Sequence, residues 1–185
     1  YIFFCLRTDG LSLSKVTKKS GILGITMGQE SHLRMPVNNF KTLVEKIKPT
    51  EIIDFALQMH KIKKIKSAAE IEKIKYICEI TSSAFEKLPE TIILGETERE
   101  CCLKLRYEIL NLGADNSPYM IAGSGFGGYD NIIMGPTDRI LENGDVLIID
   151  TGSTFDGYFC DFDRNFAFGD LSDKTRFAYE IVFNA

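Results

Sequence analysis

Residues 145–169 read DVLIIDTGSTFDGYFCDFDRNFAFG, with two apolar runs on either side of a glycine-containing middle. The first run, residues 146–149, ends at Asp150, and the second covers residues 158–168. Short apolar runs bounded by Gly and Asp are typical of strands, and glycines between them permit the chain to reverse. We therefore predict two antiparallel strands joined by a turn-rich segment, residues 151–157.

The carboxylates of this hairpin are expected to gather on one face. Side chains alternate along a strand, so Asp161 and Asp163 share a face with Phe159 and Asn165. Asp150, on the partner strand, could join them. Carboxylates are costly to bury unless they are paired or bind a metal, and oxygen ligands from adjacent strands suit shared divalent ions. The spacing alone leaves two alternatives open: a cation site, or turn residues and a solvated sheet face.

The same residues resemble the motifs of the pita-bread metallopeptidases, family M24, which include aminopeptidase P, prolidase and creatinase. The resemblance rests on Asp150-x-Gly, Gly157-Tyr, the run DFDR at residues 161–164, and GPTDR at residues 135–139. It implies that Asp150 and Asp161 are the first two ligands of a pair of divalent ions, Mn²⁺, Co²⁺ or Zn²⁺. It also implies a small peptide or other small-molecule substrate and a homodimer.

The chain departs from the family pattern at two positions. Ile133 stands where active peptidases of the group usually carry a substrate-contacting His, and an Ile cannot donate a proton. Asp163 replaces a Thr, and it would be an outer hydrogen-bond acceptor, an extra ligand or a repulsive neighbour. The catalytic residues and the remaining ligands, one His and two Glu, are expected beyond Ala185.

Three functions follow from the resemblance and remain alternatives at this point. The first is a metallopeptidase-like hydrolase of the Xaa-Pro aminopeptidase or dipeptidase class, in which two metal ions activate a water that cleaves a C–N bond. The second is a diverged, creatinase-like member that acts on a small non-peptide metabolite, which the loss of His at Ile133 favours. The third is a non-catalytic binding module, which retention of both Asp150 and Asp161 disfavours.

The resemblance also predicts two domains. Residues 1–62 would be the last part of an α/β N-terminal domain, and residues 63–185 the first half of an α+β pita-bread domain. In the first domain we predict strands at residues 2–6, 21–27 and 51–55, and a helix that starts at Pro36 and ends by Pro49. The basic cluster at residues 61–66 is interpreted as a solvated linker.

Two helices are expected to cover one face of the sheet. Each begins with a capping box, Ser67 with Glu70 and Thr97 with Glu100, in which side chains satisfy free backbone N–H groups. Pro89 is expected to end the first helix, and Gly113 follows the second in the position of a left-handed cap. The apolar faces predicted from the spacing are Ile71, Ile74, Cys78, Thr81 and Phe85 in the first helix, and Cys102, Leu105, Ile109 and Leu112 in the second.

Composition excludes several classes of partner. The net charge of −4 gives no general attraction to nucleic acid or an anionic membrane, and no apolar run approaches the length of a membrane span. The five cysteines lack metal-site spacing, so we interpret them as reduced thiols of a cytoplasmic protein. Cys160 is expected to point away from Asp161 and to be buried.

Overall fold

The computed structural model describes residues 21–185, so the predicted strand at residues 2–6 lies outside the described part. The chain divides into two compact units, Tyr1–Lys66 and Ser67–Ala185. The division falls at the end of the basic cluster, four residues after the predicted boundary at residues 62/63. Whether each unit is an independently folding domain stays a prediction.

The first unit contains a parallel strand pair joined through a helix. Strands β1 (Ile22–Ile25) and β2 (Glu51–Asp54) pair in parallel, and α2 (Val37–Lys46) lies between them in sequence, as the pattern predicted. Helix α3 (Ala56–Lys64) begins at the buried Ala56 and includes the first part of the basic cluster, for which the sequence analysis expected no helix. Its lysines are solvated but helical, which their high helix propensity permits.

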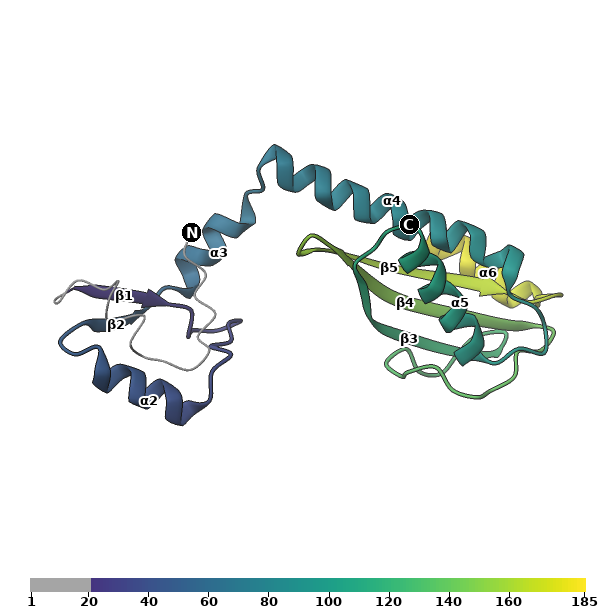
Figure 1. The fold of residues 1–185 in the computed structure, drawn as a ribbon. Coiled ribbons are helices and arrows are strands. Elements are labelled where there is room, and N and C mark those ends of the chain that lie inside the picture. The colour runs from purple at the N-terminus through teal and green to yellow at the C-terminus, as the bar shows by residue number, and fades with distance from the viewer. Residues whose placement is uncertain (1–20) are drawn as a thin grey trace. The chain divides into compact units, whose positions relative to one another are not determined.

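The second unit is a three-stranded antiparallel sheet, in the order β3-β4-β5, with helices α4 and α5 against one face (Figure 1). A final helix, α6, contributes no buried residue. Among residues 21–185 there is no helix with the length and hydropathy that a membrane crossing requires. The bounds are α4 Ala68–Thr91, α5 Glu98–Asn111, β3 Asn116–Phe126, β4 Asp145–Phe155, β5 Tyr158–Ala167 and α6 Asp173–Phe183.

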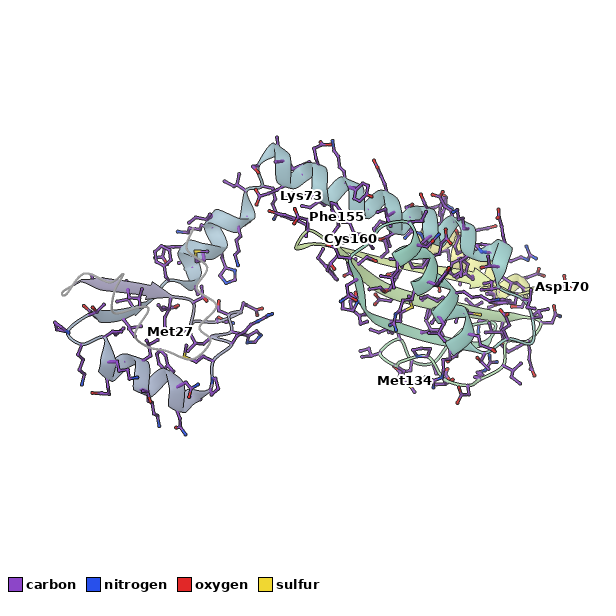
Figure 2. All side chains as sticks on the ribbon, in the orientation of Figure 1. Met27, Lys73, Met134, Phe155, Cys160 and Asp170 are labelled. Atoms are coloured by element: carbon purple, nitrogen blue, oxygen red, sulfur yellow. The ribbon has the colours of Figure 1, made fainter. Side chains whose placement is uncertain are left out.

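The predicted hairpin is present, but its turn is shorter than the sequence indicated. β4 continues through Thr151 and Ser153, both fully buried, and only Asp156 and Gly157 form the reversal, with φ of 47° and 81°. Small polar residues are typical of turns, but here their lack of bulk lets them fit under the helices. At this end of the sheet, Lys73 of α4 forms an ion pair of 2.5 Å with Asp156 and lies near Phe155 (Figure 2).

Both predicted capping boxes are confirmed, since Ser67 and Thr97 accept from the N–H groups of Glu70 and Glu100 at 3.4 and 3.2 Å. Gly113, at φ 113°, follows α5 as predicted. The buried face of α5 includes Cys102, Leu105 and Ile109, as expected.

The prediction for α4 was wrong at both ends. Its buried face begins only at Ile77. Ile71 is exposed because the hairpin end of the sheet meets the first turns of α4 through Glu70 and Lys73 instead. Pro89 lies inside the helix, which runs on to Thr91. Because Pro89 lies in the last turn, its missing N–H removes one hydrogen bond without stopping the helix. The N–H of Ile92 still donates to the carbonyl of Leu88 at 3.1 Å.

Candidate metal centre

The sheet face opposite the helices carries the predicted carboxylates. Cys160 points to the helix side, where its thiol lies 3.2 Å from the Thr81 hydroxyl, so Asp161 and Asp163 must point to the other side. Asp150 and Asp163 are directly paired across β4 and β5. The prediction that these side chains share one face is therefore confirmed, as is the burial of Cys160.

A tyrosine that the sequence analysis did not single out joins two of these carboxylates. The Tyr119 hydroxyl donates to Asp161 Oδ1 at 2.5 Å and lies 3.5 Å from Asp150 Oδ1. Tyr119 belongs to β3, which pairs with the opposite edge of β4, so no spacing within the hairpin could have revealed this contact. The structure thus brings Asp150 and Asp161 to a single hydroxyl group.

The electrostatics of this cluster favour a positive partner. Burial raises the pKa of the Asp150 carboxyl, and the negative charges of Asp161 and Asp163 raise it further. Asp161 and Asp163 are exposed, whereas Asp150 is half-buried. Like charges this close disfavour each other's ionised form, and a cation between them would relieve that repulsion.

Ile133 lies on the segment between β3 and β4, which returns alongside β3. The N–H of Ala122 donates to the Met134 carbonyl at 2.9 Å, and the N–H of Ile133 donates to Asn131 Oδ1 at 2.8 Å. The Ile133 side chain is 81% exposed, between the exposed Ile132 and Met134. The position of the family His is thus part of an apolar, solvent-facing stretch.

A second polar network, also absent from the sequence analysis, holds this segment to the sheet. Arg139 makes a bidentate ion pair with the buried Asp145, with N–O distances of 2.6 and 2.9 Å. Glu98 of α5 accepts from the Ser124 hydroxyl at 2.6 Å and from the hydroxyl and N–H of Thr137 at 2.7 and 2.9 Å. The GPTDR motif therefore has a structural use, since two of its side chains anchor the segment.

The pKa values of this network fit its anchoring role. The hydrogen bonds from Arg139 lower the pKa of the Asp145 carboxyl despite its burial. Burial opposes ionisation of Glu98, but the hydrogen bonds from Ser124 and Thr137 outweigh it and lower its pKa. Both groups are therefore charged and paired at neutral pH.

The carboxylates fit a cation in part. Asp150 and Asp161 offer hard oxygen ligands that converge on one point, which is the donor chemistry that Mn²⁺ and related ions accept. Within residues 21–185, however, no group of three or more His, Cys, Asp and Glu side chains could hold a metal ion. A complete ligand set would need residues from outside this stretch.

The helix-backed sheet with carboxylates on its open face is the first part of a pita-bread metallopeptidase domain, as predicted. The chain belongs to metallopeptidase family M24, whose model matches residues 72–185.

Similar proteins and solved structures agree with this assignment. The chain is 32% identical to the Xaa-Pro dipeptidase of Pyrococcus furiosus over 167 residues, which are 89% of this chain and 44% of the relative. It is 30% identical to the uncharacterised peptidase YqhT of Bacillus subtilis over 141 residues, 75% of this chain and 39% of the relative.

Among solved structures, the X-Pro aminopeptidase of Thermotoga maritima superposes with a TM-score of 0.78 at 25% identity, covering 95% of this chain and 48% of that one. The prolidase of P. furiosus gives a TM-score of 0.75 at 26% identity, with 94% and 49% covered. The chain thus spans about half the length of the proteins it matches.

Proposed function

We propose that the full-length protein containing this chain is a metal-dependent hydrolase that cleaves Xaa-Pro bonds in small peptides. The observation that carries the proposal is the convergence of Asp150 and Asp161 on the Tyr119 hydroxyl, on the open face of an M24 fold. The similar proteins named above include an X-Pro aminopeptidase and an Xaa-Pro dipeptidase, which supports this substrate class.

In this proposal the chain supplies one side of a dinuclear site. Asp150 and Asp161 would bind two divalent ions, Mn²⁺, Co²⁺ or Zn²⁺, with further ligands from outside residues 21–185. Such ions, when bound, polarise a carbonyl and generate a nucleophile from water at neutral pH. Asp163, opposite Asp150, adds negative charge next to the ions as an outer partner. A homodimer and a cytoplasmic location belong to the same proposal.

A second candidate is a hydrolase of a small non-peptide metabolite. The exposed Ile133 favours it, because an alkyl side chain cannot take part in the proton transfer expected of a His at this place. The apolar stretch around Ile133 would instead offer a hydrophobic contact to a substrate.

The test measures metal content and hydrolysis of Xaa-Pro dipeptides by the full-length protein. We expect bound divalent metal and activity in the wild type, and loss of both by more than roughly a hundredfold in Asp161→Ala. Removal of a direct ligand should exceed the ten- to hundredfold effect that is typical of outer partners.

Asp170→Ala is the matched control, because Asp170 is an exposed aspartate of the same unit at the sheet end away from Phe155 (Figure 2). It should leave metal content and activity unchanged. Metal without peptidase activity would favour the metabolite hydrolase, and a panel of amides, ureas and amidines would then identify its substrate. A wild-type protein with neither metal nor activity would overturn both hydrolase candidates. A non-catalytic binding module would then be the remaining alternative.

A further inference from the structure

Tyr119, Gly152 and Asp161 form one row across the three strands of the sheet. Gly152 of β4 is paired with Tyr119 of β3 on one side and with Asp161 of β5 on the other. Adjacent strands lie about 4.8 Å apart, so the backbones of Tyr119 and Asp161 are two strand spacings from each other. Only a long side chain can connect them, and it must pass over the middle strand.

Gly152 leaves space for the Phe159 ring, which packs against Tyr119 beside this connection. A Cβ at this position would lie 2.0 Å from Cζ of Phe159, whose ring therefore rests against the bare backbone. The rings of Tyr119 and Phe159 are in contact, with centroids 6.3 Å apart and planes inclined by 32°. This contact fixes the direction of the Tyr119 ring, so that its hydroxyl meets Asp161 at 2.5 Å.

The hydrogen bond leaves Asp161 able to bind a cation. A carboxylate has two oxygens and about four acceptor positions, of which Tyr119 occupies one on Oδ1. Asp161 is exposed and lies near two other carboxylates, so without a partner it would rotate into solvent and away from Asp150. The hydroxyl counters this tendency, because it holds Asp161 beside Asp150.

We propose that Tyr119 is a positioning residue that holds the Asp161 carboxylate beside Asp150, in the orientation that binds a divalent cation. This inference rests on the proposed function, because it assigns Tyr119 a role in the proposed metal site. The proposed positioning role belongs to the hydroxyl group, because a ring without the hydroxyl could still pack on Phe159.

The test is Tyr119→Phe in the full-length protein, with Co²⁺ affinity measured by isothermal titration calorimetry and the visible spectrum of the Co²⁺ complex recorded. Phe retains the ring and its contact with Phe159. We expect Co²⁺ affinity to fall about tenfold to a hundredfold, which is typical when a metal ligand loses its outer hydrogen bond. The ligand-field bands should shift, because Asp161 would adopt a different orientation at the ion.

Tyr158→Phe is the matched control. The Tyr158 hydroxyl also donates to a carboxylate, Glu70, at 2.9 Å, but on the side of the sheet that packs against α4. Its removal should leave the Co²⁺ affinity within about twofold and the spectrum unchanged, since it does not contact a proposed ligand. Tyr119→Leu is a second variant that needs no ring packing, and the same loss is expected if the Phe variant does not fold.

The outcomes distinguish this inference from the proposed function. Wild-type protein that binds no Co²⁺ would overturn both. Co²⁺ binding by Tyr119→Phe with wild-type affinity and spectrum would overturn the positioning role alone. An equal loss of affinity in Tyr158→Phe would also overturn it, because the effect would then be general to the fold.

Discussion

Asp145 and Asp150 lie on the same strand but have opposite surroundings. Asp145 is 1% exposed and receives two hydrogen bonds from Arg139, which lower its pKa. Asp150 is half-buried near two carboxylates, and its pKa is raised by burial first and by their charges second. A carboxylate with its own cation stabilises the fold, whereas one among other carboxylates is available for a ligand. At the scale of the residue, the charges next to each aspartate therefore decide whether it stabilises the fold or is available to a ligand.

The Arg139–Asp145 pair predicts a pH-dependent loss of stability. In Arg139→Met, the buried Asp145 carboxylate loses its charged partner, and we expect the free energy of unfolding to fall by about 3 kcal/mol. The folded state of the wild type lowers the pKa of Asp145, so the pair's contribution is complete above the unfolded value, about pH 4. It should shrink as the pH falls from there through the lower, folded value.

Urea unfolding at several pH values measures this difference. Arg99→Met is the control, because Arg99 pairs with Asp138 at 2.9 Å but both side chains are largely exposed. Such surface pairs contribute up to about 1 kcal/mol. A cost for Arg139→Met that is equal to that of Arg99→Met, or that is independent of pH, would contradict the structural role of the pair.

At the scale of the element, β4 is the strand that defines both faces of the sheet. Its buried residues, Leu147, Ile149 and Thr151, face the helices, and the alternate positions Asp150 and Gly152 face the carboxylate cluster. The strand can do this only while its register with β5 is kept, because a slip by one residue would move every side chain to the other face. Because the fit at Gly152 is close, a substitution there tests the register of β4 with β5.

Gly152→Ala is predicted to lower the free energy of unfolding by about 1–3 kcal/mol, the usual cost of overpacking. The new Cβ would lie 2.0 Å from the ring of Phe159 and 2.9 Å from the carbonyl oxygen of Cys160. Phe159→Ala in the same chain should recover only part of this cost, since it removes the ring but not the backbone clash. Thermal unfolding of the two single variants and the double variant measures the coupling.

Gly135→Ala is the control for this prediction. A Cβ at Gly135 meets nothing within 4 Å, so the substitution should be neutral or stabilise the protein slightly by restricting the unfolded chain. Equal effects at the two glycines would mean that the ring of Phe159 does not rest on Gly152 in solution.

At the scale of the whole molecule, the principal core lies within residues 67–185. It joins one face of the sheet to α4 and α5, and its fully buried members include Ile77, Leu105 and Leu147. The other face of the sheet and α6 contribute little to this core, and Phe177 and Val182 of α6 are largely exposed. The matched proteins are about twice as long, and the proposed site needs ligands in addition to those within residues 21–185.

Residues 67–185 are therefore expected to unfold cooperatively when expressed without the first unit. Leu105→Ala should lower the free energy of unfolding of this fragment by about 3 kcal/mol, since Leu105 is fully buried. Leu103→Ala, two residues away on α5 but 55% exposed, should change it by less than about 0.5 kcal/mol. Chemical unfolding followed by circular dichroism measures both, and a fragment without a cooperative transition would contradict the prediction.

The sequence by itself determined the hairpin, the shared face of Asp161 and Asp163, both capping boxes and the family. These features are encoded locally, in strand alternation, in side chains three residues apart and in short motifs. It misplaced the ends of β4 and α4, because Thr151, Ser153 and Pro89 resemble turn and stop signals whose outcome depends on packing.

Only the tertiary structure decided which side chains meet across elements. Tyr119 reaches Asp161 over a distance of 42 residues in sequence, and Glu98 receives its hydrogen bonds from residues 26 and 39 positions away. Such contacts depend on the order and register of strands, which no local pattern specifies. For that reason the carboxylates were predictable from the sequence, whereas the hydroxyl that unites them was not.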